Sequence, residues 1–192
     1  TAVFFVQGHW TWFFIALWFH GAFGSMLSAA NHELGHGTVF KTQSLNRFFL
    51  RLNSLLTWWN FHEYSMSHTF HHRNTLHTEG DREVQLPKKP SLQLLLLMQL
   101  ITFNFQKLYF RASRSFLTAC GCFSTQPLKA VNDMGATKWH HALAEVYPEK
   151  QKDAVRWARI MLGFHGSIIL VPLVFQAWWL VILICGFNFI GN

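Results

Sequence analysis

Charged residues are confined to the middle of this chain of 192 residues. All 16 Lys and Arg lie between Lys41 and Arg159, residues 1–40 contain a single charge at Glu33, and residues 160–192 contain none. Only 13% of the residues are charged and 51% are hydrophobic, whereas a globular domain carries roughly 25% charge. The distribution argues against a soluble domain and is typical of a membrane protein with one large polar region.

Two uncharged segments are long enough to cross a bilayer, whose hydrocarbon core is roughly 30 Å thick. We expect a transmembrane helix over residues 3–30 and one or two spans over residues 160–192, interrupted at Pro172. The excess of Lys and Arg between them predicts that residues 31–159 are cytoplasmic or interfacial, with an interfacial helix over residues 91–106. The expected fold is a single all-α integral membrane domain whose polar, histidine-bearing helices form a cytoplasmic cap.

Cysteine usage and net charge narrow the possible classes of protein. Cys120, Cys122 and Cys185 are an odd set without a C-x-x-C pair, which excludes a disulfide scaffold or a thiolate zinc module. The net charge of +7 would attract an acidic protein or anionic lipid headgroups. Plain positive-inside topology explains the same charges equally well, and we expect no nucleic-acid partner. Because the chain begins at Thr1 and stops at Asn192 inside an apolar run, we expect an incomplete sequence.

Two clusters among the 12 histidines have the spacing of metal ligands. In the first cluster, N-H-E-L-G-H, His32 and His36 stand at positions i and i+4. In the second, H-T-F-H-H, His68, His71 and His72 stand at i, i+3 and i+4. Residues at these spacings share one face of a helix, so each cluster can direct its imidazoles at a common point. Both clusters lie where the polar region meets the membrane, which predicts a metal site there.

The first cluster also contains H-E-x-x-H, the zinc protease signature in which Glu33 would be the general base. The extended signature fails, because Val39 and Thr42 occupy its Gly and third His positions. A tetrahedral zinc ion also cannot use five imidazoles. Iron accepts more ligands, and two irons together can activate dioxygen to attack an unactivated C–H bond. A zinc protease, or a non-catalytic membrane protein whose histidines pack or bind zinc, remains the alternative from another class.

The two clusters, followed by R-N-T-L-H-T-E-G-D-R-E-V, resemble the membrane fatty-acid desaturase superfamily over residues 31–87. The resemblance implies that two irons are held by His32, His36, His68, His71 and His72. It also implies dioxygen as co-substrate, a lipid or acyl chain as substrate, and a cytochrome b5 or ferredoxin as electron donor. Desaturation is the leading expectation, and a lipid, carotenoid or alkane hydroxylase or ketolase of the same superfamily is the runner-up. The third histidine box of that family does not occur before Asn192.

Three acidic residues are candidates for orienting the ligand imidazoles by accepting their N–H hydrogen bonds. Glu33 lies between the first two ligands, and Asp81 and Glu83 follow the second cluster. No other catalytic residue is expected beyond the metal ligands.

Other histidines have weaker claims on the metal. His165 lies within an apolar segment, where a polar group needs a partner, so it is a possible auxiliary ligand. For His62 and His77, which flank the second cluster, we expect structural roles. The neighbours His140 and His141 are expected at the surface.

Overall fold

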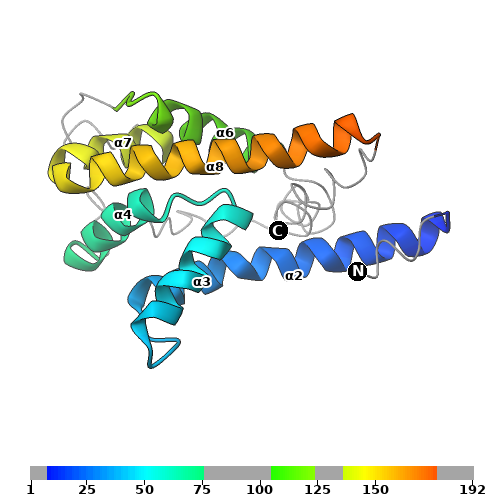
Figure 1. Cartoon of the computed structure of the whole chain (residues 1–192). Coiled ribbons are helices and arrows are strands. Elements are labelled where there is room, and N and C mark those ends of the chain that lie inside the picture. The colour runs from blue at the N-terminus through cyan, green and yellow to red at the C-terminus, as the bar shows by residue number, and fades with distance from the viewer. Residues whose placement is uncertain (1–7, 76–104, 124–135, 177–192) are drawn as a thin grey trace, which may run out of the picture. The chain divides into compact units, whose positions relative to one another are not determined.

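The computed structural model of the protein describes residues 8–75, 105–123 and 136–176. Every regular element in these ranges is a helix (Figure 1), which confirms the all-α expectation for this part of the chain. The helices are α2 (Trp10–His36), α3 (Gln43–Leu56), α4 (Phe61–Arg73), α6 (Phe105–Ala119), α7 (Ala136–Val146) and α8 (Pro148–Val174). Most of the helix expected over residues 91–106 lies outside the described residues.

The chain divides into two compact units. Within the described residues, the first unit contains α2, α3 and the part of α8 that starts at Phe164. The second contains α4, α6 from Phe110, α7 and the part of α8 that ends at Gly163. Each histidine cluster belongs to a different unit, because the first lies at the end of α2 and the second lies in α4.

α2 is one of two described helices that are long and apolar enough to cross a membrane. Its 27 residues give about 40 Å of helix at about 1.5 Å per residue. The helix extends past the expected end at residue 30 and includes the whole first histidine cluster. It ends at Gly37, whose φ of 71° lies in the left-handed region that glycine adopts without a steric penalty.

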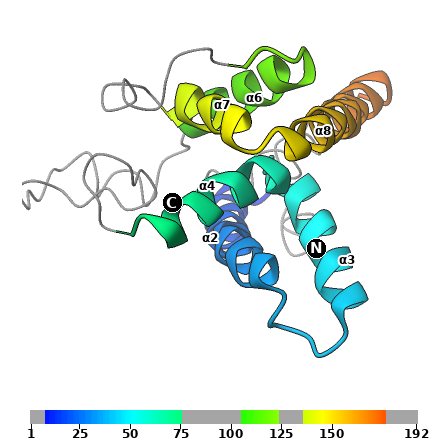
Figure 2. The ribbon, with the colours of Figure 1, turned by 90° about the vertical axis from the view of Figure 1, so that its left-hand side faces the viewer.

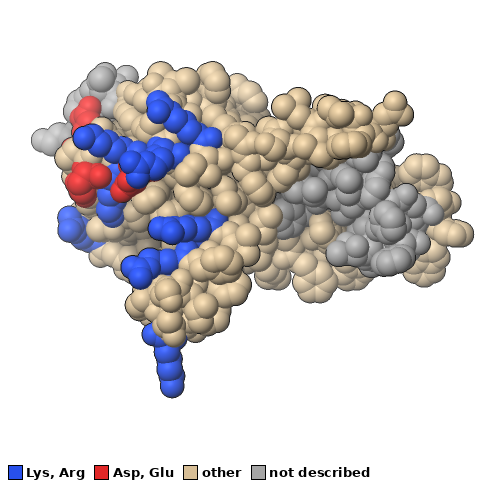
Figure 3. Space-filling view, in the orientation of Figure 1, with Lys and Arg blue, Asp and Glu red and all other residues tan. Residues whose placement is uncertain are grey.

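α8 is the second helix that could cross a membrane, and it also has 27 residues. It begins at Pro148, so the charged residues before Ile160 and the apolar residues after it form one helix. In Figure 3 the Lys, Arg, Asp and Glu side chains of α8 gather at its N-terminal end. The expected interruption at Pro172 was misplaced, because α8 continues through Pro172 and ends at Val174.

α4 carries the second histidine cluster and is fixed at its start by Asn60. The Asn60 side-chain oxygen accepts hydrogen bonds from the backbone N–H groups of His62 (3.2 Å) and Glu63 (3.3 Å), which satisfies two free donors of the first turn. Its amide nitrogen donates to the carbonyl of Ala154 in α8 at 2.8 Å. Asn60 is only 2% exposed, so water cannot take over the hydrogen bonds of the cap or the bond to Ala154 if the side chain is removed.

Removing the Asn60 side chain should therefore destabilise the second unit. Asn60→Ala loses the cap and the bond to α8, and we expect the free energy of unfolding to fall by about 2–3 kcal/mol. Asn60→Ser keeps a capping oxygen and loses only the bond to Ala154, so it should cost about 1 kcal/mol. Urea unfolding of the full chain in detergent would measure both. Equal losses in the two variants would show that the cap contributes nothing.

One face of α4 packs in the core of the second unit. Met66 is fully buried against Ala142, Leu143 and Ala144 of α7. The two alanines present little bulk at this contact, which lets the helices approach closely. Glu63, Met66 and Ser67 are the buried residues of α4, and their spacing places them on one side of the helix. The histidines of the second cluster are therefore displayed on a neighbouring side.

Candidate metal centre

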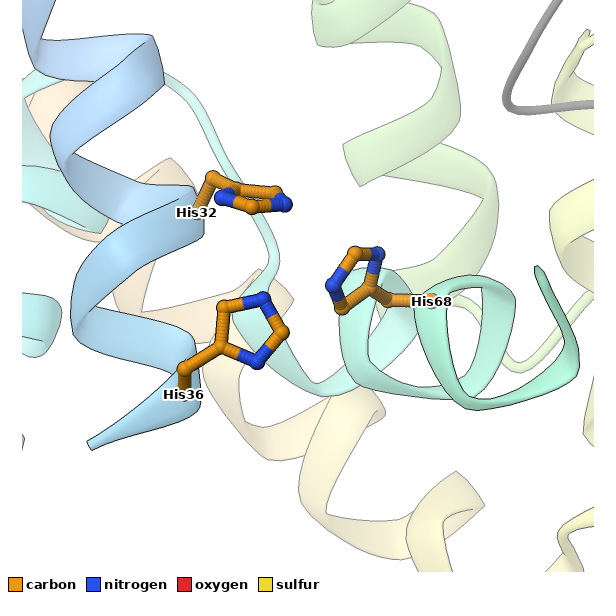
Figure 4. Close-up of side chains that lie close together, drawn as sticks. All are labelled: His32, His36 and His68. Carbon is orange, nitrogen blue, oxygen red and sulfur yellow. The ribbon is translucent and has the colours of Figure 1, made fainter. Parts of the chain in front are cut away.

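The first histidine cluster forms the last turn of α2. The ring centroids of His32 and His36 are 4.7 Å apart, and Figure 4 shows the two rings on the same side of the helix. The preceding residue, Asn31, is fully buried and donates a hydrogen bond to the Thr57 hydroxyl at 2.9 Å. This bond fixes the rotation of α2, so that His32 is half-buried and His36 is exposed.

A carboxylate engages one nitrogen of the first cluster. Glu33 Oε1 lies 2.8 Å from Nδ1 of His32, with 60% and 43% of the two side chains exposed. An imidazole that donates its Nδ1 proton to a carboxylate keeps the Nε2 lone pair available for a metal ion. Glu33 therefore makes the contact that an orienting residue needs.

The second cluster brings three imidazoles together on α4. Nε2 of His68 and Nε2 of His72 are 3.0 Å apart, and their ring centroids are separated by 4.5 Å. The His71 ring lies 5.9 Å from that of His68 and 5.6 Å from that of His72. His68 and His71 are half-buried, whereas His72 is exposed. Figure 4 shows the His68 ring projecting from α4.

Tyr64 supports this cluster and was missed by the sequence analysis. Its hydroxyl lies 3.2 Å from Nδ1 of His68, and the two rings stack with centroids 4.9 Å apart. When Nδ1 carries the proton, the phenol oxygen accepts it as a hydrogen bond and Nε2 is free to bind metal. The i, i+4 spacing of Tyr64 and His68 was the only available signal, and it is common in helices for packing reasons.

The donor set fits a transition-metal ion. A metal ion about 2.1 Å from each of two imidazole nitrogens, bound at right angles, holds those nitrogens about 3 Å apart. The Nε2 atoms of His68 and His72 are within hydrogen-bonding distance of each other, and their separation of 3.0 Å is close to this value. Neutral imidazoles with a fixed Nδ1 proton are ligands that iron and zinc both accept. The local geometry of each cluster is therefore compatible with metal binding.

A buried polar network lies on the packed side of α4. Glu63 is 1% exposed, and its Oε2 forms an ion pair with Arg114 Nε of α6 at 3.0 Å. Its Oε1 accepts a hydrogen bond from the Thr118 hydroxyl, which also lies 3.0 Å from Nε2 of His141 in α7. The network ties α6 and α7 to α4, the helix that bears the second cluster. Burial raises the pKa of the Glu63 carboxyl, and the charge of Arg114 and the Thr118 bond counteract that effect.

His141 corrects one expectation, because it is 4% exposed rather than at the surface. Thr118 donates its single proton to Glu63, so His141 must donate its Nε2 proton to the Thr118 oxygen. The imidazole is neutral at pH 7, because its pKa lies well below that value. Burial, aided by the positive charge of Arg114, lowers the pKa of His141 from 6.5 to about 4. The adjacent pair of histidines in the sequence gave no sign of this contact.

The lowered pKa of His141 predicts a loss of stability in mild acid. The unfolded chain takes up this proton near pH 6.5 and the folded protein only near pH 4, so unfolding binds a proton between these values. The free energy of unfolding should fall by about 2 kcal/mol between pH 7 and pH 5. His141→Gln keeps a donor for Thr118 without the titration. The free energy of unfolding of wild type and of this variant is measured with urea at several pH values, and the difference between them isolates the contribution of His141. If the two free energies change in parallel with pH, the prediction is wrong.

The remaining candidates separate into described and undescribed residues. His165 is 1% exposed, and its Nε2 lies 2.6 Å from the carbonyl oxygen of Leu55. The polar partner that we expected for a histidine in an apolar segment is therefore a backbone group. The half-buried His62 packs on Phe61 with ring centroids 4.1 Å apart. The side chains of His77, Asp81, Glu83 and His140 lie outside the described part of the chain.

Comparison with known proteins gives one match, which is to a protein family and covers most of the chain. The model of the fatty acid desaturase family matches residues 8–191, which is nearly the whole chain and includes both histidine clusters. No curated protein and no solved structure matches the chain.

Proposed function

Because the chain belongs to the fatty acid desaturase family, whose members are membrane-associated oxidoreductases of lipid metabolism, we propose that it is a di-iron desaturase. In this proposal it uses dioxygen to introduce a C=C bond into the acyl chain of a membrane lipid or fatty acid. The centre lies on the cytoplasmic side of the membrane, as the positive-inside rule favours.

The proposed iron ligands are the five histidines of the two clusters, His32, His36, His68, His71 and His72. The observation that carries the proposal is the pair of Nε2 atoms of His68 and His72, 3.0 Å apart on a helix whose rotation is fixed by buried contacts. The matched family and the chemistry of a five-imidazole donor set support a centre shared by both clusters. We retain His165, a buried imidazole within the apolar part of α8, as a candidate auxiliary ligand.

Bound iron would supply the reduction of dioxygen and the removal of hydrogen from unactivated C–H bonds, which side-chain acids and bases cannot perform. In the overall balance a –CH₂–CH₂– unit loses two hydrogens. Dioxygen takes up these two hydrogens together with two electrons and two protons, and it leaves as two water molecules. Glu33 and Tyr64 hold the Nδ1 protons of His32 and His68, which keeps each Nε2 directed at the centre. We propose the same orienting role for Asp81 and Glu83.

We propose that the two electrons come from outside these 192 residues, which contain no flavin, haem or ferredoxin motif. A cytochrome b5 or a ferredoxin is the proposed donor. Its acidic surface would be attracted by the net charge of +7. The acyl chain would reach the centre from the membrane, since the first cluster forms the last turn of the candidate span α2.

Product analysis tests the proposal. The full chain, reconstituted in phosphatidylcholine nanodiscs with ferrous iron, a reductase and either donor, is given oxygen, and its lipids are analysed by mass spectrometry. We expect acyl chains that have lost two hydrogens, formed only when oxygen and the donor are both present. Chains that gain an oxygen atom would instead indicate the hydroxylase or ketolase reaction of the same superfamily. Peptide hydrolysis that persists without oxygen would overturn the proposal in favour of a zinc protease.

A further inference from the structure

The helix α3 has its polar side inward and its apolar side outward. Its buried residues are Asn46, Asn53 and Ser54. Leu45, Phe48 and Leu52 are 43%, 58% and 40% exposed, and their spacing places them along one side of the helix. If this side of α3 faced water, it would expose a continuous apolar stripe while polar side chains occupied the interior. A helix on the surface of a soluble protein has the opposite arrangement of apolar and polar side chains.

The buried polar side of α3 is held by specific hydrogen bonds, so the helix cannot rotate to hide the stripe. Asn46 donates from its amide nitrogen to the carbonyls of Gly37 and Phe40, each at 2.8 Å, and accepts from the Phe40 N–H at 2.9 Å. At the other end of α3, the Thr57 hydroxyl donates to the Asn53 carbonyl at 2.7 Å and accepts from Asn31 of α2 at 2.9 Å. The outward direction of the apolar stripe is therefore fixed by the fold.

The same bonds locate α3 at one end of the candidate span α2. Asn46 contacts Gly37, directly after α2, and Thr57 contacts Asn31, which lies about 9 Å back along the helix axis. The 14 residues of α3 extend about 21 Å. Both ends of α3 are thus held near the last two turns of α2, so α3 remains at that end of the span (Figures 1 and 2). In a membrane this is the level of the lipid headgroups.

Basic side chains border the stripe. Arg47 and Arg51 are exposed and stand one turn apart beside it, and Lys41 is exposed just before α3. Neither arginine forms an ion pair with an acidic residue among those that the structure describes. On the face drawn in Figure 3, the surface over α3 carries Lys and Arg and no Asp or Glu. An apolar stripe bordered by arginines at headgroup level matches the chemistry of an anionic lipid, with acyl chains beside a phosphate.

We propose that α3 is an interfacial helix that binds anionic phospholipid. Leu45, Phe48 and Leu52 insert among the acyl chains, and Arg47 and Arg51 contact the lipid phosphates. The arginine stems lie along the apolar boundary while their guanidinium groups reach the charged layer. Because Asn46 couples α3 to the turn that follows His36, lipid binding also fixes the depth of the first histidine cluster. This inference does not depend on the reaction that the protein catalyses.

The depth of the stripe can be measured with a fluorescent label. In a variant with serine at positions 120, 122 and 185, Phe48→Cys is labelled with a polarity-sensitive dye, and Asp153→Cys on the charged start of α8 is the control. The full chain is placed in nanodiscs that contain lipids with a spin label near the headgroup end of the acyl chain. We expect quenching of the label at position 48 to be severalfold stronger than that at position 153. Equal lipid quenching, with access of the position-48 label to aqueous iodide, would overturn the proposal.

Lipid selectivity tests the role of the arginines. Spin-labelled phosphatidylglycerol and phosphatidylcholine are compared for association with the protein in nanodiscs. Wild type should prefer the anionic lipid, and Arg47→Gln with Arg51→Gln should reduce the preference by about fivefold for each arginine, which corresponds to about 1 kcal/mol. Arg156→Gln, an exposed arginine on α8, should leave it unchanged. If the double variant keeps the lipid preference and instead loses binding of the electron donor, α3 is a protein-docking surface and the proposal fails.

Discussion

Replacing His71 by alanine is expected to abolish iron binding and activity. The ring centroid of His71 lies within 6 Å of those of both His68 and His72. Its loss would therefore remove one of the three ligands that we propose α4 supplies. Loss of groups that only orient a ligand already weakens metal binding by about 10–100-fold. Removing a ligand should therefore weaken iron affinity by at least about 100-fold. The readouts are iron per chain after anaerobic loading and lipid product formed per chain.

His62 provides the matched control for His71. It is a histidine on the same helix, it precedes the cluster, and its ring is half-buried against Phe61. His62→Ala should retain iron close to the wild-type level while losing some stability. Normal iron content and turnover in His71→Ala would remove the second cluster from the proposed centre. A loss as large in His62→Ala would mean that iron content reports only the integrity of α4.

Replacing Arg114 by methionine is expected to destabilise the second unit strongly. The Glu63 carboxylate is 1% exposed, and its ion-pair partner among the described residues is Arg114. Removing one partner of a buried pair leaves an uncompensated charge and costs about 3–5 kcal/mol. The cost is limited by protonation of Glu63, whose pKa burial already raises. Denaturant unfolding of the full chain in detergent measures the loss.

Two further variants identify the cause of that loss. Arg114→Met combined with Glu63→Gln removes both charges, so the double variant should recover a large part of the lost free energy. Arg156→Met breaks the exposed pair with Asp153, whose atoms are 3.9 Å apart, and should cost no more than about 0.5 kcal/mol. An Arg114→Met variant as mild as Arg156→Met, or a double variant less stable than the single one, would contradict the account of a stabilising buried pair.

The sequence predicted the features of this protein that depend on local spacing. Charge distribution indicated two apolar segments, and α2 and α8 are the described helices that could cross a membrane. The i, i+4 spacing predicted that His32 and His36 share a helix face, and their ring centroids are 4.7 Å apart. The family resemblance rested on short motifs at 31–87, and the family match over residues 8–191 confirms it.

The features that the sequence did not predict depend on contacts between distant residues. Glu63 and Thr118 are 55 positions apart, and Thr118 and His141 are 23 apart, so no local pattern joins them. Glu63 follows the N-cap residue Asn60 by three positions, and its side chain points into the unit, where it meets Arg114 and Thr118 of α6.

The most direct test concerns the claim that both clusters hold one centre. Ferrous iron affinity and iron per chain are measured for wild type, His36→Ala, His72→Ala and the double variant, all in nanodiscs without oxygen. Ligands of one centre act as a unit, so we predict that each single variant loses iron as completely as the double variant does. If each single variant instead keeps about half of the wild-type iron and the two losses add, the clusters bind metal independently and the shared centre is wrong.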